Sequence, residues 1–266
     1  MIGAGRSATI CVDMSNVTSA RRHAGILEIL ARDGFVDVGH LKRLLDCSEA
    51  TVRRDLAHLH QAGYLRRTHG GAVSNNMREL PFRAKLVTMA EAKQRIAQEA
   101  AETIGEGQAI GFTGGTTTQQ VARKLASRTG LTVVTNSLTV AMELADSDTR
   151  VIVTGGELRR QTYEFVGPLA EPVASQIHLD LMFVGVDGMS LDGGLTTHNP
   201  MEAGINRVLI DCSNEVTIVA DHTKLGREAF AQIAPVDVVS TLITDAEAAE
   251  EQTTEFEKAG VRVIKV

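Results

Sequence analysis

The sequence predicts an α/β protein with two parts: a small winged helix-turn-helix domain, then a larger α/β domain with a mostly parallel sheet. Three short helical stretches and a glycine-flanked hairpin fit within residues 20–73, which is typical of a winged helix. Beyond residue 86, seven short apolar runs alternate with helical stretches, as in a parallel sheet covered on both faces. Of the 266 residues, 43% are hydrophobic, enough to bury one full domain and a smaller one.

Changes in periodicity and composition divide the chain into four segments. Residues 1–19 show no periodicity, so we expect a tail, and we expect it to be dispensable up to Asp13. Residues 20–73 form the winged helix. The polar stretch 74–85 is the expected linker, and residues 86–266 form the α/β domain.

The cysteine pattern and hydropathy predict a cytoplasmic protein. Cys11, Cys47 and Cys212 form no C-x-x-C pair, which argues for reduced thiols and against a thiolate metal site. The opening residues do not form a secretory signal, and no apolar run reaches the roughly 18 residues of a membrane span. We expect no membrane partner, no metal and no cofactor.

Charge is distributed unevenly along the chain. Residues 20–73 carry nine Arg or Lys against six Asp or Glu, which is net +3, although the whole chain is −6. The acidic remainder favours solubility, and the basic end is the candidate polyanion binder.

Helical periodicity sets the inner faces of the first two helices. Apolar residues at helical spacing over residues 22–31 predict the first helix. The second is expected over residues 40–45, with Leu41, Leu44 and Leu45 turned inward.

A third helix is expected between Ser48 and Gly63. The Ser48 hydroxyl is a good N-cap, and glycine commonly follows a helix end. At 100° per residue, Val52 and the two leucines that follow it face inward, whereas Arg54 faces outward. Asp55 falls at the edge of the core, where we expect it to pair with an arginine of the same domain.

The outward face of this third helix has the chemistry of a DNA-reading surface. Small alanines allow close approach to a groove, and arginines can contact guanine edges or phosphates. An isolated arginine pair would more simply be a solvated pair, but a second basic pair lies on the adjoining hairpin. We predict double-stranded DNA as partner. The expected contact residues are Ser48, Thr51, Arg53, Arg54, Arg66, Arg67 and His69.

The segment Gly114–Thr118 joins a buried strand to a helix and is the candidate anion site. Glycines allow close backbone approach, and the first N–H groups of a helix favour an anion. The segment matches neither the nucleotide-triphosphate nor the dinucleotide glycine pattern. A tight strand-to-helix turn without a ligand explains it equally well by itself.

Further polar residues follow the other predicted strands, where ligands of open parallel sheets bind. This convergence favours a small-molecule effector. The effector residues expected on these grounds are Gly114, Gly115, Thr116, Thr117, Asn136, Ser137, Gly156, Asp187 and Thr197.

Several motifs agree at once with one known family. SEATVRRDL and LRRTHGGAV lie in the N-terminal part, and GGTTT, VVTNS, TGGELR, VGP, VGVDG, GGLTT and ADHTKLGR follow in the larger domain. Over about residues 20–245 the chain resembles the DeoR family of bacterial sugar-metabolism regulators. The resemblance implies a repressor of a carbohydrate catabolism operon that binds operator DNA as a homo-oligomer, a dimer or tetramer, and responds to a phosphorylated sugar or sugar derivative. It also adds Glu202 and Lys224 to the expected effector residues.

Two positions depart from the family pattern. Family members commonly carry Asp at or beside Thr113, and they tend to carry Lys at Asn206. Loss of a carboxylate and a cation could change ligand preference, so the identity of the sugar and whether it is phosphorylated stay open.

An alternative is a sugar-phosphate isomerase-like enzyme that carries a DNA-binding domain. The larger domain also resembles ribose-5-phosphate isomerase, whose reaction needs a positioned base and a group that stabilises an enediolate. Asp187 and Glu202 could supply carboxylates, but Asn206 removes a candidate cation. We therefore expect a regulator without catalytic residues.

Overall fold

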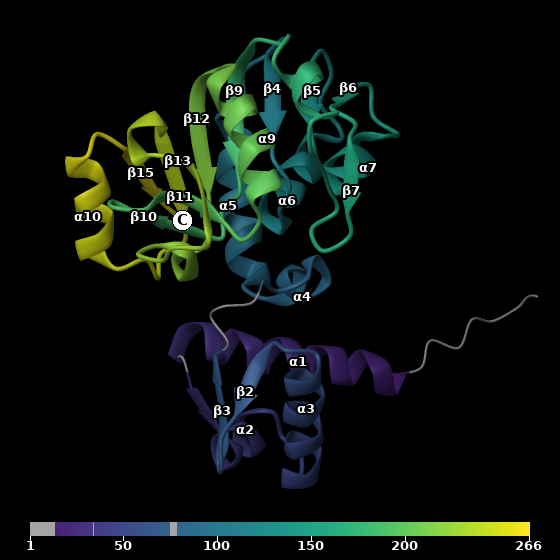
Figure 1. Cartoon of the computed structure of the whole chain (residues 1–266), viewed down its shortest axis with the longest axis vertical. Helices are drawn as coiled ribbons and strands as arrows, with labels where there is room; N and C mark the ends of the chain where they lie inside the picture. Colours follow the sequence, from purple (N-terminus) through teal and green to yellow (C-terminus); the bar gives the residue numbers. More distant parts are fainter. Residues whose placement is uncertain (1–13, 34, 75–78) are drawn as a thin grey trace, which may run out of the picture. The chain divides into compact units, whose positions relative to one another are not determined.

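The structure is a computed structural model that describes residues 14–33, 35–74 and 79–266 (Figure 1). The chain divides into two compact units, residues 1–75 and 76–266. The tail up to Asp13 lies outside the described residues. Within the described ranges, no helix is both long and apolar enough to cross a membrane.

The first unit is a winged helix-turn-helix, as predicted. Its elements are α1 (Met14–Asp33), β1 (Phe35–Asp37), α2 (Val38–Leu44), α3 (Glu49–Gln61), β2 (Leu65–Arg67) and β3 (Gly71–Ser74). The three strands form an antiparallel sheet in the order β1-β3-β2. Ile26 of α1, Leu41 of α2, and Val52 and Leu56 of α3 are buried in its core.

Two details of this unit differ from the prediction. α1 begins at Met14, so residues 14–19 are helical rather than part of a tail. Leu44 is 58% exposed instead of inward. The second helix begins earlier than predicted, at Val38, and Val38 shifts the buried stripe so that Leu44 lies about 90° from its centre.

The second unit is built on a seven-stranded parallel sheet, which confirms the predicted fold class. All seven predicted apolar runs are strands of this sheet: β4 (Ala109–Phe112), β5 (Thr132–Thr135), β6 (Arg150–Val153), β9 (Leu179–Val184), β12 (Ser213–Val219), β14 (Thr241–Thr244) and β15 (Arg262–Lys265). Their order is β15-β14-β12-β9-β4-β5-β6, with every pairing parallel.

Helices cover both faces of the sheet and enclose two apolar cores. The helices of this unit are α4 (Phe82–Val87), α5 (Ala90–Glu102), α6 (Thr116–Leu125), α7 (Leu138–Leu144), α8 (Glu171–Ala174), α9 (Pro200–Asp211) and α10 (Glu250–Lys258). One core joins α5, α6 and α7 to the sheet through side chains such as Ile96 and Val121. The other core is closed mainly by α9, through Ile205 and Leu209.

Two small antiparallel sheets, which the sequence did not indicate, accompany the parallel sheet. One is the hairpin of β7 (Glu157–Arg159) and β8 (Glu164–Val166). The other contains β10 (Gly188–Ser190), β11 (Gly194–Thr197) and β13 (Ala231–Ala234). Two short 3₁₀ turns, η1 (His222–Lys224) and η2 (Val236–Val238), complete the unit.

The C-terminal half of the predicted linker is folded into this second unit, contrary to the prediction for residues 74–85. Glu79 and Phe82 are buried, and Phe82 begins α4. The ring of Phe82 packs edge-to-face on Tyr163, with the ring centres 5.4 Å apart. The polar composition of residues 79–85 gave no sign that they are folded, because their packing partners lie on a hairpin about eighty residues later in the sequence. Residues 75–78 lie outside the described ranges.

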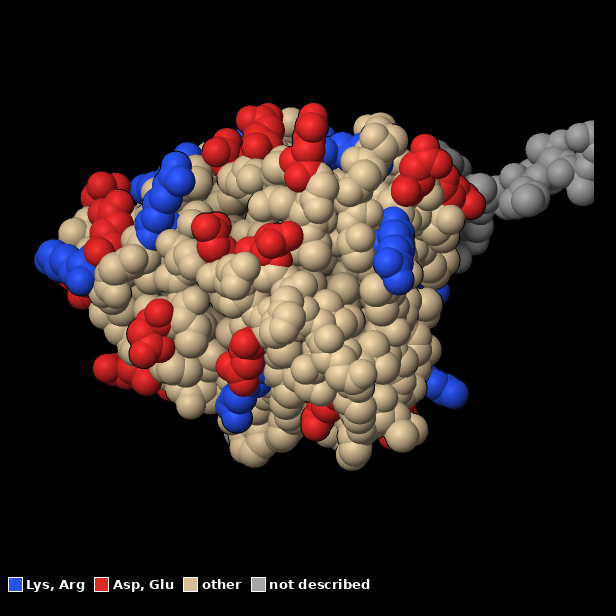
Figure 2. Space-filling model, turned by 90° about the horizontal axis from the view of Figure 1, so that it is seen from above, with Lys and Arg blue, Asp and Glu red and all other residues tan. Residues whose placement is uncertain are grey.

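Charged side chains on the second unit are mixed in sign. The face drawn in Figure 2 carries separate acidic and basic side chains with uncharged surface between them. Such a face gives no continuous basic track for a polyanion.

Candidate functional site

The third helix of the first unit is capped and presents its basic residues to solvent. The Ser48 hydroxyl accepts a hydrogen bond from the Thr51 N–H at 3.2 Å, so the predicted N-cap is confirmed. Arg53 and Arg54 are exposed. Arg53 makes a surface ion pair with Glu49 at 3.7 Å, whereas Arg54 makes no ion pair with any described residue. Arg54 is therefore the more available of the two for a nucleic acid.

The wing adds a second basic stretch. Arg66 and Arg67 lie on β2, and His69 follows in the turn before β3; all three are exposed. With Ser48 and Thr51 exposed or half-buried on α3, all seven expected DNA contacts are accessible within this unit.

Asp55 holds α1 and α3 together. Its carboxylate accepts hydrogen bonds from Arg22, at 2.7 and 3.2 Å, and contacts His23 at 3.0 Å. Burial would raise the pKa of Asp55, but the hydrogen bonds from Arg22 and His23 lower it below its ordinary value. The predicted pairing of Asp55 with an arginine is confirmed.

In the second unit, the turn between β4 and α6 carries an uncapped helix N-terminus. No side chain caps the first turn of α6, so its leading N–H groups remain available to a ligand. Gly115 adopts φ 138°, a conformation suited to glycine. Thr113 is fully buried and accepts a hydrogen bond from Gly185 N–H at 2.9 Å. Thr113, where family members commonly carry Asp, therefore binds a backbone N–H next to this turn.

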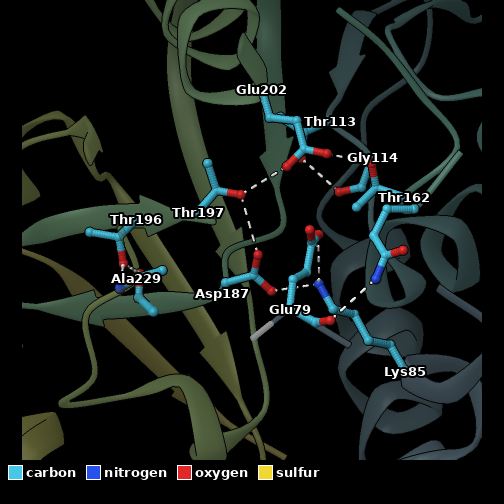
Figure 3. Close-up of polar contacts among 12 residues, drawn as sticks. Glu79, Lys85, Thr113, Gly114, Thr162, Asp187, Thr196, Thr197, Glu202 and Ala229 are labelled. Carbon is cyan, nitrogen blue, oxygen red and sulfur yellow. Dashed lines mark hydrogen bonds and ion pairs between the residues drawn. The ribbon is translucent and has the colours of Figure 1, made fainter. Parts of the chain in front are cut away.

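A largely buried polar cluster lies beside this turn (Figure 3). Its centre is an ion pair between Lys85 of α4 and Asp187, with Nζ and Oδ1 2.6 Å apart. The Thr197 hydroxyl bridges Asp187 and Glu202, at 3.2 and 3.0 Å. Lys85 also lies 3.7 Å from a Glu79 oxygen. We call Glu79, Lys85, Arg159, Asp187, Thr197 and Glu202 the polar cluster.

Arg159 of β7 closes the polar cluster from the hairpin side. Its guanidinium donates to Glu202 at 2.9 Å and to Glu79 at 3.1 Å. Thr162, in the hairpin turn, donates to Glu202 as well. Each of the two cations, Lys85 and Arg159, is therefore matched by two carboxylates.

These contacts perturb the ionisable groups in the directions expected for buried pairs. Burial would lower the pKa of Lys85, but the carboxylates of Asp187 and Glu79 raise it. Burial would raise the pKa of Asp187, yet Lys85 and Lys224 hold it well below its usual value. Burial raises the pKa of Glu202 despite the hydrogen bond from Thr162.

Some of the expected effector residues lie together at one site, and others do not. Asp187, Thr197 and Glu202 are brought together in the polar cluster. Gly114 lies against Glu164, and Asn136 donates to the same carboxyl group at 3.2 Å. These predicted positions therefore converge on one site. Next to Gly114, Gly115 is the N-cap of α6, and Thr116 and Thr117 are its first two residues.

Three expected residues have other structural roles. Ser137 caps α7, since its hydroxyl accepts from Val140 N–H at 3.3 Å. Gly156 has φ 111°, and any Cβ there would crowd the Val166 carbonyl. Lys224 lies in η1 and acts on Asp187 through its charge.

Sequence reasoning missed five polar residues of the site. They are Glu79, Lys85, Arg159, Thr162 and Glu164. Arg159 is the last residue of the TGGELR motif, so this motif could have indicated Arg159 as a site residue. Glu79 and Lys85 lie in a stretch whose polarity indicated a linker.

The fold and these two sites together define a DNA-binding transcription regulator with a separate sensor domain. The particular family follows from two matches. The DeoR-like helix-turn-helix domain matches residues 22–78, and the DeoR C-terminal sensor domain matches residues 88–246. The chain belongs to the DeoR family, which confirms the resemblance seen in its motifs.

Curated relatives cover nearly the whole chain. The HTH-type transcriptional regulator GlpR of Haloferax volcanii is 39% identical over 92% of this chain and 97% of its own length. The glycerol-3-phosphate regulon repressor of Escherichia coli is 35% identical, over 85% and 90%. The putative aga operon transcriptional repressor of Escherichia coli O157:H7 is 33% identical, over 94% of each chain. These relatives are regulators, and the chain is a regulator rather than an isomerase-like enzyme.

Among solved structures, ribose 5-phosphate isomerase A from Methanocaldococcus jannaschii is similar to part of the chain. Its TM-score is 0.40 at 17% identity, over 52% of this chain and 55% of that one. A likeness at this level carries no argument about activity.

Proposed function

We propose that this protein is a cytoplasmic repressor of a carbohydrate catabolism operon, controlled by a small phosphorylated sugar or polyol. DNA would be bound through α3 and the β2-β3 wing, by a dimer or tetramer. The names of the Escherichia coli relatives, which refer to glycerol 3-phosphate and the aga operon, support this class of regulon.

The observation that carries the effector proposal is the pairing of two complementary features in the sensor domain. The uncapped first turn of α6 offers N–H donors to an anion. The neighbouring polar cluster offers carboxylate acceptors, Asp187 and Glu202, to hydroxyl groups. A ligand with a phosphate at one end and hydroxyls at the other complements both.

The polar cluster also suggests how the effector would act on DNA binding. Residues 75–78 connect the two units in sequence; Glu79 follows them directly, and Lys85 lies six residues further on, in α4. A ligand that competes for Arg159 or Asp187 would loosen the ion pairs that hold Glu79 and Lys85. Effector binding would thereby change the connection to the DNA-binding unit.

Thermal unfolding of the full chain with matched ligands tests the effector class. Glycerol 3-phosphate and a panel of hexose phosphates are compared with their unphosphorylated parents. A true effector at 100 times its Kd stabilises the sensor domain by about 2.7 kcal/mol, whereas its parent should give no shift. A shift produced by neutral sugars or organic acids, and by none of the phosphates, would refute the phosphate assignment.

A further inference from the structure

The side chain of Glu164 lies against Gly114, the residue before the N-cap Gly115 of α6. Glu164 is the first residue of β8 and is 5% exposed. A Cβ on Gly114 would overlap Cγ, Cδ and Oε1 of Glu164, so only glycine allows this carboxyl group to lie against the turn. The backbone is fixed on both sides, since Leu138 N–H donates to Tyr163 O at 2.9 Å and Phe165 N–H donates to Asn136 O at 2.7 Å.

The backbone at this position is also unusual. Tyr163, directly before Glu164, has φ 59°, a left-handed conformation that is unfavourable for a non-glycine residue. This conformation turns the hairpin so that Glu164 enters β8 while Thr162 reaches Glu202.

No cation of the described part of the chain is paired with Glu164. Its hydrogen-bond partner is Asn136, whose Nδ2 donates to Oε2 at 3.2 Å and also to Asn206 Oδ1 at 3.1 Å. Within the described residues, Glu164 makes no ion pair, and Asn136 Oδ1 is buried without a hydrogen-bond partner. The site thus contains an unused buried acceptor next to a carboxyl group.

The charged groups that face Glu164 disfavour its ionisation. Glu202 on α9 and Asp187 after β9 repel a negative charge, and Lys85 on α4 attracts it but is already bound to Asp187. Arg159 on β7 is directed to Glu79 and Glu202. Burial and the neighbouring Glu202 raise the pKa of Glu164 well above its ordinary value.

We propose that Glu164 is a neutral carboxylic acid in the folded protein, and that its O–H donates a hydrogen bond to the anionic group of the effector at the first turn of α6. This inference rests on the proposed phosphorylated effector. An ionised Glu164 would repel a phosphate at this position, whereas the neutral acid supplies a donor beside the N–H groups of α6. Glu164 would then contribute to selectivity for anionic over neutral sugars.

The protonation state can be measured on the full chain without any ligand. Difference infrared spectroscopy compares the wild type with Glu164→Gln near pH 7. We expect the wild type to show a carbonyl band of a protonated carboxylic acid that the variant lacks. Glu106→Gln, which changes an exposed glutamate, is the matched control and should leave this band in place. If Glu164→Gln removes only carboxylate bands, the inference is overturned, whatever the effector is.

The donor role is tested by calorimetric titration with glycerol 3-phosphate and inorganic phosphate as probes. Glu164→Gln keeps an N–H donor and should bind within about threefold of the wild type near pH 7. Glu164→Ala should bind about tenfold more weakly, the size of one hydrogen bond to a charged group. As pH rises, wild-type affinity should fall relative to Glu164→Gln, because only the wild type can lose the donor proton.

The outcomes separate the two proposals. If Glu164→Ala binds like the wild type, or if wild type and Glu164→Gln share one pH profile, the donor role is wrong although phosphate binds. If neither probe nor any sugar phosphate binds, the proposed effector class and the donor role fail together, and the infrared band still decides whether Glu164 is protonated.

Discussion

Asp55 shows how one carboxylate on α3, the helix proposed to contact DNA, can instead stabilise the fold. It directly follows the exposed Arg53 and Arg54, but its own side chain contacts Arg22 and His23 of α1. His23 in turn stacks on His58, with ring centres 5.2 Å apart. The orientation of α3 against α1 therefore depends on this contact.

Replacing Asp55 by Asn should destabilise the first unit by about 1–2 kcal/mol, because a neutral amide leaves the Arg22 guanidinium poorly compensated. Since the pKa of Asp55 is lowered in the fold, its contribution is present above an unfolded pKa of about 3.9 and is lost as pH falls through the folded value. Hydrogen exchange of α1 amides measures the loss of stability on substitution and the loss of stability as pH falls. Glu49→Gln, at an exposed pair, is the control and should change stability by less than about 0.5 kcal/mol; equal losses would contradict the prediction.

At the scale of elements, α3 and the wing should contribute differently to DNA binding. Ser48 fixes the start of α3, so the exposed Arg54 is held on a capped, regular helix. Arg66 instead lies on a three-residue strand beside the turn of the wing. A helix is the element that enters a major groove, whereas a wing most simply meets the phosphate backbone.

Arg54→Ala should therefore weaken operator binding by about 1–3 kcal/mol and relax base preference, because it removes a base-edge contact. Arg66→Ala should weaken binding to all sequences alike. It should also make the affinity less dependent on salt concentration, by the amount that one phosphate contact contributes. Fluorescence anisotropy with operator variants at several salt concentrations separates the two effects. If both variants bind the operator like the wild type, α3 and the wing are not the DNA-binding surface.

The turn before α6 is the corresponding element of the sensor domain. Gly115 has φ 138°, and a Cβ there would lie 3.1 Å from the Thr118 hydroxyl. Gly115→Val should distort the turn, so the protein should bind DNA but give no thermal shift with its effector. Gly130→Val is the control, because Gly130 also has positive φ but has open space around it. A normal effector response in Gly115→Val would place the anion elsewhere.

For the whole molecule, the segment before α5 determines where the sensor domain begins. The family match starts at residue 88, yet Glu79 and Lys85 are two of the five charged side chains in the polar cluster. A sensor domain cut at residue 88 would leave Asp187 without Lys85 and Arg159 without Glu79, and losing the partner of a largely buried charge is costly.

A fragment of residues 79–266 should therefore unfold cooperatively and bind the effector, whereas a fragment of residues 88–266 should be less stable by about 3 kcal/mol or more. Thermal and urea unfolding of both fragments, with and without effector, measures the difference. Equal stability and equal binding would show that the segment from Glu79 to Val87 is only a linker.

Much of the architecture follows from local pattern alone. Seven apolar runs predicted all the strands of the parallel sheet, because a strand buried on both faces must be apolar along its length. Likewise, Ser48 and the spacing of Val52 and Leu56 predicted the cap and inner face of α3. Such signals depend on neighbours in sequence, so the sequence contains them fully.

The composition of the sensor site depended on tertiary structure instead. The sequence by itself placed Asp187 and Thr197 at the ends of predicted strands, and its resemblance to a known family added Glu202. Only the fold showed that Thr197, in a small antiparallel sheet, joins Asp187 to Glu202 on α9. The fold also brought Lys85 from an apparent linker to Asp187, and Glu164 from an unpredicted hairpin to the turn at Gly114. The physical reason is that ion pairs and desolvation act through space, between residues that no periodicity connects. The protonation of Glu164 and the pairing of Lys85 are accordingly properties of the folded chain.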